Sequence, residues 1–258
     1  MKLDAYIRKR LESSKVLVMT HLIAGFPSLA ANWEMLEEMG QAGVDLVELQ
    51  MPFSEPVADG PTFARANQHA LAQGLKLDQY FGLMEKAAKT YPFPLLMMGY
   101  YNTVFRLGHQ AFCETLHTRG GVGFILPDLP VEEYGDLFAH SQRCELHPIM
   151  LMAPTNTDER LARIGRHAAG MVYAVARKGV TGGKTELAGG TYDFVARCRR
   201  ATDQPIGMGF GLRQGEDVRR LQGQVEVAIV GSALLEAWER GGRPAYRALL
   251  AELVAART

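Results

Sequence analysis

The feature that most constrains the fold of this 258-residue chain is a set of eight short apolar runs. They are rich in Val, Ile, Leu and Met, and they span Val16–Ala24, Val44–Met51, Pro94–Met98, Val122–Leu126, Pro148–Met152, Met171–Val175, Pro205–Met208 and Val225–Val230. Such continuous hydrophobicity is typical of strands that are buried on both faces of a parallel sheet. The runs start about 30 residues apart on average, which is the length of a βα unit. The pattern therefore predicts repeated βα units.

The segments between these runs have the sequence signals of helices. Ser28 and Gly43 bracket one segment in which apolar residues recur at helical spacing. Another begins with the capping signal Thr155–Thr157, and the last carries an apolar stripe over residues 246–254. No low-complexity linker interrupts the alternation, so we expect residues 1–258 to form one domain. Eight repeats in this length predict an α/β fold, a (β/α)8 TIM barrel, with a doubly wound sheet as the main alternative.

Composition argues against several other classes of protein. The chain has 28 basic and 28 acidic residues without a block of like charges, so it predicts no nucleic acid and no membrane surface as partner. Cys113, Cys144 and Cys198 are widely spaced, which argues against a disulfide framework and a structural zinc site. The amino terminus lacks the apolar core of a signal peptide, and no run reaches membrane-spanning length. We expect a cytoplasmic protein with a small-molecule ligand and no metal.

The barrel prediction indicates where a ligand would bind. Active sites of this architecture lie at the carboxyl ends of the strands, and phosphate is commonly held after strands 7 and 8. The seventh run continues into Gly209 and Gly211, and the eighth into Gly231 and Ser232. Glycine allows a ligand to approach the backbone closely, and free N–H groups at a helix start attract an anion. These two turns predict a phosphate site.

Two acidic residues stand out beside the second run. The two-residue period of a strand places Glu48 with Leu46 and Gln50 on one side of that run. A carboxyl group buried in a strand is costly unless it is paired or used. The proline-rich loop that follows ends near Asp59, at the expected mouth of the barrel. The two carboxyl groups are therefore candidates for shared acid and base catalysis.

These acids lie in a set of segments that resembles the α subunit of tryptophan synthase. The matching segments are ELQMPFSEPVADGP (48–61), MGYYNTVF (98–105), LPDLPVEE (126–133), RKGVTGG (177–183), GFG (209–211) and VGSAL (230–234). They occur in order over nearly the whole chain. The resemblance implies a barrel that cleaves indole-3-glycerol phosphate to indole and glyceraldehyde 3-phosphate, without a cofactor of its own. It also implies a partner, the pyridoxal-phosphate β subunit of an α2β2 complex.

The resemblance also implies roles for individual residues. Glu48 would be the general acid and base, Asp59 would accept the indole N–H, and Tyr173 would support Glu48. The segment RKGVTGG (177–183), which follows strand 6, would be a loop that folds over the substrate as a lid. Its Thr181 would contact Asp59, the acid after strand 2. The remaining residues would bind the substrate. The phosphate would be held at Gly182, Gly211, Gly231 and Ser232, and indole would be lined by Met98, Tyr100, Ile125 and Phe210.

Three residues depart from the family pattern. Gln50 replaces a glycine, His21 replaces an aromatic residue that packs on indole, and Glu55 replaces an aspartate in the loop that meets the β subunit. His21 is expected to contact the substrate, although a lone histidine is more often a packed residue than a catalyst. Gln50 would share a strand face with Glu48, so it could hydrogen-bond that carboxyl or narrow the pocket.

These departures leave three functions open. The first is the lyase within a tryptophan synthase complex. The second is a free-standing lyase that releases indole, which the altered partner loop would permit. The third is a weakly catalytic allosteric or binding subunit. Retention of Glu48, Asp59 and Thr181 together disfavours the third function.

Overall fold

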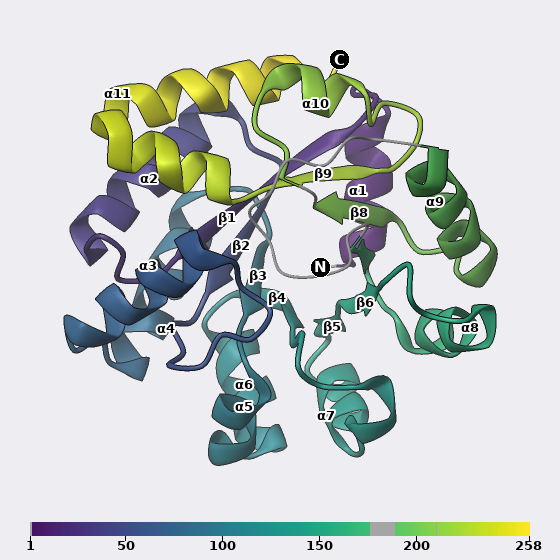
Figure 1. Cartoon of the computed structure of the whole chain (residues 1–258). Helices are drawn as coiled ribbons and strands as arrows, with labels where there is room; N and C mark the ends of the chain where they lie inside the picture. The colour runs from purple at the N-terminus through teal and green to yellow at the C-terminus, as the bar shows by residue number, and fades with distance from the viewer. Residues whose placement is uncertain (1, 176–188, 210) are drawn as a thin grey trace.

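Parallel strands form the inner layer of the molecule, and helices surround them (Figure 1). The computed structural model describes residues 2–175, 189–209 and 211–258. The strands in these ranges are β1 Leu17–Ile23, β2 Leu46–Gln50, β3 Leu95–Met98, β4 Gly121–Ile125, β5 His147–Pro148, β6 Met150–Met152, β7 Val172–Ala174, β8 Ile206–Gly209 and β9 Val227–Val230. They pair in the order β5-β4-β3-β2-β1-β9-β8-β7-β6. Each apolar run that the sequence predicted as a strand contributes to this sheet.

The fifth run differs from its prediction because it forms two short strands. β5 pairs with β4, whereas β6 pairs with β7 on the other side. Pro148 lacks an N–H and cannot donate to a sheet ladder, and the segment changes neighbours between Ile149 and Met150. Ile149 donates to the carbonyl of Phe124 at 2.9 Å. The two ends of the sheet order are thus adjacent in the chain, so the barrel is nearly closed and the TIM-barrel prediction is confirmed.

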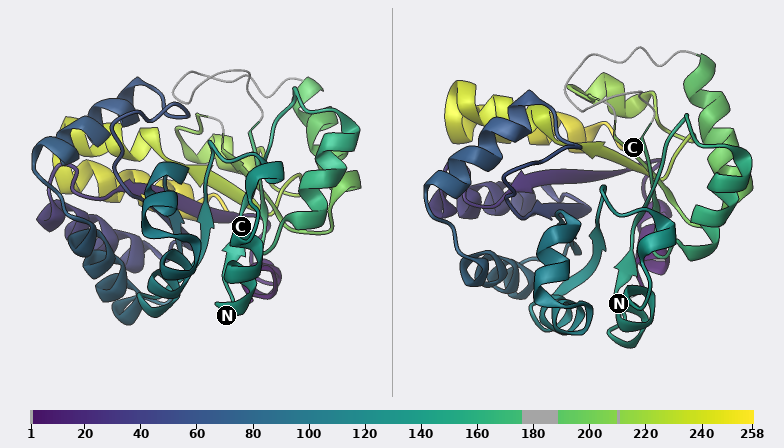
Figure 2. Two further views of the ribbon diagram at one scale, coloured as in Figure 1. Left: turned by 90° about the horizontal axis from the view of Figure 1, so that it is seen from below. Right: turned by 60° about the horizontal axis from the view of Figure 1, so that its bottom comes forward.

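The helices form the outer layer in the side views as well (Figure 2). Their bounds are α1 Leu3–Leu11, α2 Leu29–Ala42, α3 Pro61–Ala72, α4 Leu77–Thr90, α5 Tyr101–Leu107, α6 His109–Thr118, η1 Val131–Glu133, α7 Leu137–Arg143, α8 Asp158–His167, α9 Gly189–Ala201, α10 Gly215–Arg219 and α11 Ser232–Ala255. No described helix is long and apolar enough to span a membrane.

The predicted helix signals act where the sequence placed them. The Ser28 hydroxyl accepts the Ala31 N–H at 3.1 Å at the start of α2, and Gly43 ends that helix with φ 74°. Thr157 caps α8 in the same way. The apolar stripe at residues 246–254 belongs to the second half of α11, after non-helical backbone at Gly241 and Gly242.

The amino-terminal helix α1 was not predicted, and it has a structural role. Its buried residues Leu3 and Ile7 pack in the same apolar cluster as Leu17 and Leu46, which lie at the start of β1 and β2. The backbone N–H of Leu3 also donates to His147 Nε2 at 3.2 Å. α1 therefore fills the amino-terminal end of the barrel and makes that end of the interior apolar.

The alternation along β2 determines which side chains face the barrel interior. Leu46 packs in the inner cluster, while Val47 and Leu49 pack against the surrounding helices. Glu48 and Gln50 share the side of Leu46, as the two-residue period predicts. In the parallel register of β1 and β2, His21 lies beside Glu48. Polar side chains are thus brought together at the carboxyl end of an otherwise apolar interior.

Candidate active site

Glu48 is buried in the barrel interior with very few polar partners. Its side chain is 3% exposed, and Oε1 lies 3.4 Å from Nδ1 of His21. Within the described residues, Oε2 has no hydrogen-bond partner. Burial is the main cause that raises the pKa of this carboxyl to about 8, and the negative charge of Asp59 adds to it. Glu48 therefore holds its proton at neutral pH.

Asp59 has several hydrogen-bond donors around it. It ends the loop before α3, and its Oδ2 accepts from Gln50 Nε2 at 2.6 Å and from Asn67 Nδ2 at 3.2 Å. Tyr100 makes a further hydrogen bond to the carboxyl. Burial raises the pKa of Asp59, the donors oppose this effect, and the resulting pKa is about 6. At pH 7 the pocket thus combines one protonated and one ionised carboxyl group.

His21 joins the two acids through Gln50. Its Nε2 lies 2.7 Å from Gln50 Oε1, and its ring centroid lies 4.4 Å from that of Phe63. Burial lowers the pKa of His21 to about 4, while the hydrogen bond to Gln50 opposes this shift. The imidazole is therefore neutral at pH 7, and its contact with the protonated Glu48 is not an ion pair.

Helix α3 supplies two residues of the site that sequence analysis missed. Phe63 packs on His21, and the fully buried Asn67 lies one helical turn farther along. Besides donating to Asp59, Asn67 accepts the backbone N–H of Phe53 at 3.0 Å, which fixes the start of the loop before α3. An asparagine four residues after a phenylalanine on the inner face of a helix is the signal that would have identified this pair.

The residues expected to line indole lie around the same interior. Met98 ends β3 and Ile125 ends β4, and both belong to the inner apolar cluster with Tyr100. Tyr173 lies in β7, where burial is the main cause that raises its pKa and the nearby carboxyl groups of Glu48 and Asp59 add to the shift. A Cβ atom on Gly209 would lie 2.6 Å from the Tyr173 hydroxyl, so glycine in β8 makes room for that ring.

The predicted phosphate turn after β9 adjoins His21 and Phe63. A Cβ atom on Gly231 would lie 2.6 Å from the Phe63 ring and 3.2 Å from Cβ of His21. Ser232 begins α11 and is 9% exposed. Gly211 follows β8 with φ 59°. Thr181, Gly182 and Phe210, the other residues expected to bind substrate, lie outside the described residues.

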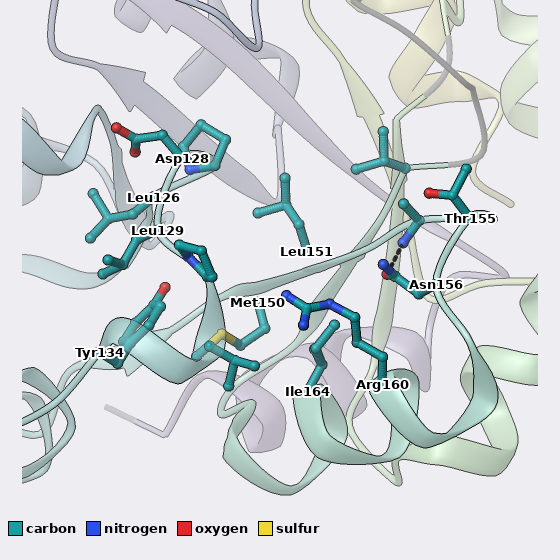
Figure 3. Close-up of a pocket in the computed structure, with 15 residues that line it drawn as sticks. Leu126, Asp128, Leu129, Tyr134, Met150, Leu151, Thr155, Asn156, Arg160 and Ile164 are labelled. Atoms are coloured by element: carbon teal, nitrogen blue, oxygen red, sulfur yellow. Dashed lines mark hydrogen bonds between the residues drawn. The ribbon is translucent and has the colours of Figure 1, made fainter.

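A separate cavity of about 560 Å³ lies between the loop after β4 and helix α8 (Figure 3). Arg160 extends into it from α8 and binds Glu132 through two hydrogen bonds, at 2.7 and 3.2 Å. The LPDLPVEE segment forms one wall, with Asp128 near its top in this view. None of the described residues that the sequence assigned to the site lines this cavity. Within the described ranges, no cluster of three or more His, Cys, Asp or Glu residues could hold a metal ion.

Comparison with known proteins decides the family. A sequence model described as tryptophan synthase alpha chain matches residues 7–256. The chain belongs to the tryptophan synthase alpha chain family. The alpha chain of Syntrophotalea carbinolica is 42% identical over 251 residues, which cover 97% of this chain and 99% of that relative.

Solved structures of tryptophan synthase have the same fold. The Mycobacterium tuberculosis enzyme aligns with a TM-score of 0.92 and 33% identity, over 99% of this chain and 97% of that chain. A tryptophan synthase α2β2 complex from Pyrococcus furiosus aligns with a TM-score of 0.85 and 28% identity, over 94% and 98% of the two chains. Membership in the tryptophan synthase alpha chain family confirms the prediction of a carbon–carbon lyase of tryptophan biosynthesis.

Proposed function

We propose that this chain cleaves indole-3-glycerol phosphate with Glu48 as general acid and base and Asp59 as the acceptor of the indole N–H. The observation that carries these roles is a pair of buried carboxyl groups with different surroundings, Glu48 with an oxygen that has no partner among the described residues and Asp59 with the amide donors of Gln50 and Asn67. Pairs of acids whose surroundings separate their pKa values are typical of acid–base sites. Tyr173 would support Glu48, and the ring-lining residues Met98, Tyr100 and Ile125 would hold the indole between them.

The proposed reaction leaves Glu48 protonated again, because the proton that it gives to indole C3 is replaced by the proton of the substrate hydroxyl. Glu48 delivers its proton to indole C3, while Asp59 stabilises the positive charge that develops on the ring nitrogen. The bond between C3 and the side-chain carbon then breaks, and its electron pair restores the aromatic ring. The hydroxyl on that carbon becomes the aldehyde of glyceraldehyde 3-phosphate and gives its proton to Glu48. The site needs no cofactor for this cycle.

The substrate phosphate is assigned to the turns after β8 and β9. Gly211, Gly231 and Ser232 are the described residues of this subsite, and Gly182 would complete it. The start of α11 supplies N–H groups and the positive end of a helix dipole, with the Ser232 hydroxyl as an additional donor. Since Gly231 lies against His21 and Phe63, a phosphate held there places the rest of the substrate near the two acids.

We also propose a tryptophan synthase β subunit as partner, in an α2β2 complex such as the one solved from Pyrococcus furiosus. Two large apolar side chains near the carboxyl end of the barrel support an interface there. Val57 is 70% exposed and Phe105 is 68% exposed. Glu55 lies in the same loop as Val57 and is also exposed, so its longer side chain would face the partner and not the substrate.

The remaining assignments concern the whole chain. We propose that residues 1–258 act as one domain, because every described strand belongs to one sheet. We also propose a cytoplasmic location, in keeping with three free cysteines and with a role in amino-acid biosynthesis.

Indole formation tests the proposed function directly. The purified chain is incubated with indole-3-glycerol phosphate, alone and with a tryptophan synthase β subunit, and indole is measured. We expect indole in both cases and faster turnover with the partner. Absence of indole under both conditions would contradict the lyase roles, whereas indole formation that does not respond to the β subunit would contradict the proposed partnership.

A further inference from the structure

Two buried side chains, His21 and Gln50, connect the two acids in a continuous polar line. From Glu48 Oε1 the line passes to His21 Nδ1 at 3.4 Å, and from His21 Nε2 to Gln50 Oε1 at 2.7 Å. It ends where Gln50 Nε2 meets Asp59 Oδ2 at 2.6 Å. None of the four residues is more than 8% exposed, so water does not compete freely for these groups.

Simple hydrogen-bond rules fix the direction of this line. An ionised carboxylate only accepts, so the amide NH2 of Gln50 faces Asp59 and its carbonyl oxygen faces His21. That oxygen requires a donor, which places the proton of the neutral imidazole on Nε2. Nδ1 is then a lone pair that faces Glu48. The complementary form of Glu48 is the protonated acid, whose Oε1 lies 3.4 Å from this lone pair, at the outer limit of hydrogen-bond distance.

We propose that His21 and Gln50 are positioning residues that hold Glu48 as a proton donor and connect its protonation to the ionised state of Asp59. This inference rests on the proposed acid and base roles of the two carboxyl groups. It gives a shared role to His21 and Gln50, which are joined by a hydrogen bond of 2.7 Å. A glycine at position 50 would leave the buried His21 Nε2–H without its acceptor, and such an unpaired group is costly.

Other titratable groups around the acids do not share this role. The phenols of Tyr80, Tyr100 and Tyr173 lie within reach of the charge of Glu48 or Asp59, and burial is the main cause that raises the pKa of each above its ordinary value of 10. The three phenols remain neutral between pH 5 and 9. Among the described groups around the acids, changes of protonation in that interval therefore belong to Glu48 and Asp59, because the pKa of His21 is lowered to about 4.

The tautomer of His21 gives a test that does not depend on activity. Protein with 15N-labelled histidine is studied by long-range 1H–15N NMR at pH 7, and the His21 signals are assigned by their loss in His21→Phe. We expect an Nε2–H neutral ring in the wild type. In Gln50→Met, which keeps the side-chain length without the amide, we expect signals of the Nδ1–H form to grow. A wild-type ring that is charged or Nδ1–H, or a tautomer unchanged in Gln50→Met, would overturn the proposal.

The pH dependence of kcat/KM gives the second readout. Activity falls at low pH when Asp59 is protonated and at high pH when Glu48 is ionised, so the profile is bell-shaped. In Gln50→Met, Asp59 loses a donor and its pKa rises, while the freed His21 can donate to Glu48 and lower its pKa. Each limb is expected to move inward by roughly one pH unit, with about a tenfold loss of kcat/KM at the optimum.

Two further variants separate this role from packing. Gln142→Met makes the same chemical change on the outside of α7 and is expected to leave both limbs in place. The double variant His21→Phe, Gln50→Met is expected to lose no more activity than the worse single variant, because the two residues act as a unit. A double variant whose loss of kcat/KM is the product of the two single losses would contradict the proposal. A pH profile of Gln50→Met with both limbs at their wild-type positions would contradict it as well. If the wild type makes no indole, the proposed lyase roles fail, while the NMR result still decides the arrangement of His21 and Gln50.

Discussion

Two glutamates, one between outer helices and one inside the barrel, are almost equally buried but have opposite surroundings. Glu38 of α2 is 1% exposed and Glu48 of β2 is 2% exposed. Glu38 accepts hydrogen bonds at 2.6 to 2.7 Å from Arg243 and Arg247 of α11. These guanidinium groups lower its pKa to about 2, whereas burial without a cation raises that of Glu48 to about 8.

The difference shows how one residue type serves two purposes in this fold. The arginine pairs of Glu38 connect α2 to α11, two helices that lie side by side on the outside of the barrel (Figure 1). Glu48 has an unpartnered oxygen and a neutral imidazole as its neighbour. A buried acid with matched cations contributes to packing, while one that is kept protonated and underpartnered is suited to proton transfer.

The largest expected effect is on catalysis. Glu48→Gln removes the transferable proton and keeps the shape of the side chain, so kcat is expected to fall about a thousandfold or more with KM changed little. Glu38→Gln is the matched control at the outer site and is expected to retain kcat within about twofold. Steady-state indole formation measures both. Activity of Glu48→Gln within about tenfold of the wild type would remove Glu48 from its proposed role.

The second effect is a pair of opposite trends in stability with pH. Folded Glu48 keeps a proton that the unfolded chain releases above pH 4.5, so wild-type stability falls as pH rises from about 4.5 to 8. Glu48→Gln escapes this loss and is expected to be more stable than the wild type at pH 7.5, by on the order of 2 kcal/mol. At pH 4 the two proteins should have the same free energy of unfolding. Urea unfolding at several pH values measures the difference.

The stability that Glu38 contributes changes with pH in the opposite direction, because the pKa of Glu38 is lowered in the folded protein. Its contribution is present above the ordinary pKa of 4.5 and is lost as pH falls toward 2. Glu38→Gln is therefore expected to be less stable than the wild type at pH 7, by about 1 kcal/mol, with the gap narrowing below pH 4.5. If both variants changed stability in the same direction at pH 7.5, the contrast between the two sites would be wrong.

The smallest expected effect lies at the phosphate turn. Ser232→Ala removes one hydroxyl donor near the start of α11 and leaves both acids in place. KM is expected to rise about tenfold, the effect of one hydrogen bond to the charged phosphate, while kcat and both pH limbs stay as in the wild type. A large fall in kcat with unchanged KM would instead connect Ser232 to the acid pair.

The sequence could predict much of this arrangement because the strands, the alternation of faces and the helix starts are determined by residues close together in the chain. The apolar runs located the strands, and the two-residue period of β2 placed Glu48 and Gln50 on one face. The glycine turn before Ser232 correctly marked a helix start beside the site. These features depend on residues that are close together in the chain.

Contacts between segments that are far apart in the chain could not be predicted from local sequence patterns. The hydrogen bond between His21 and Gln50 depends on the register of β1 with β2, and the contact of Phe63 with His21 depends on how α3 packs. Both require the closed barrel. The amino-terminal helix was missed because its two buried residues, Leu3 and Ile7, stand among many charged ones, and its role appears only when the barrel has an end to fill.

The central claim is that burial keeps Glu48 protonated as a proton donor at neutral pH. The most direct measurement is a 13C NMR titration of its side-chain carboxyl from pH 4 to 10, assigned by the signal that disappears in Glu48→Gln. We predict a protonated carboxyl at pH 7 with a midpoint near 8. A midpoint near 4.5, the ordinary value for glutamate, would mean that Glu48 is ionised at pH 7 and would contradict its role as proton donor.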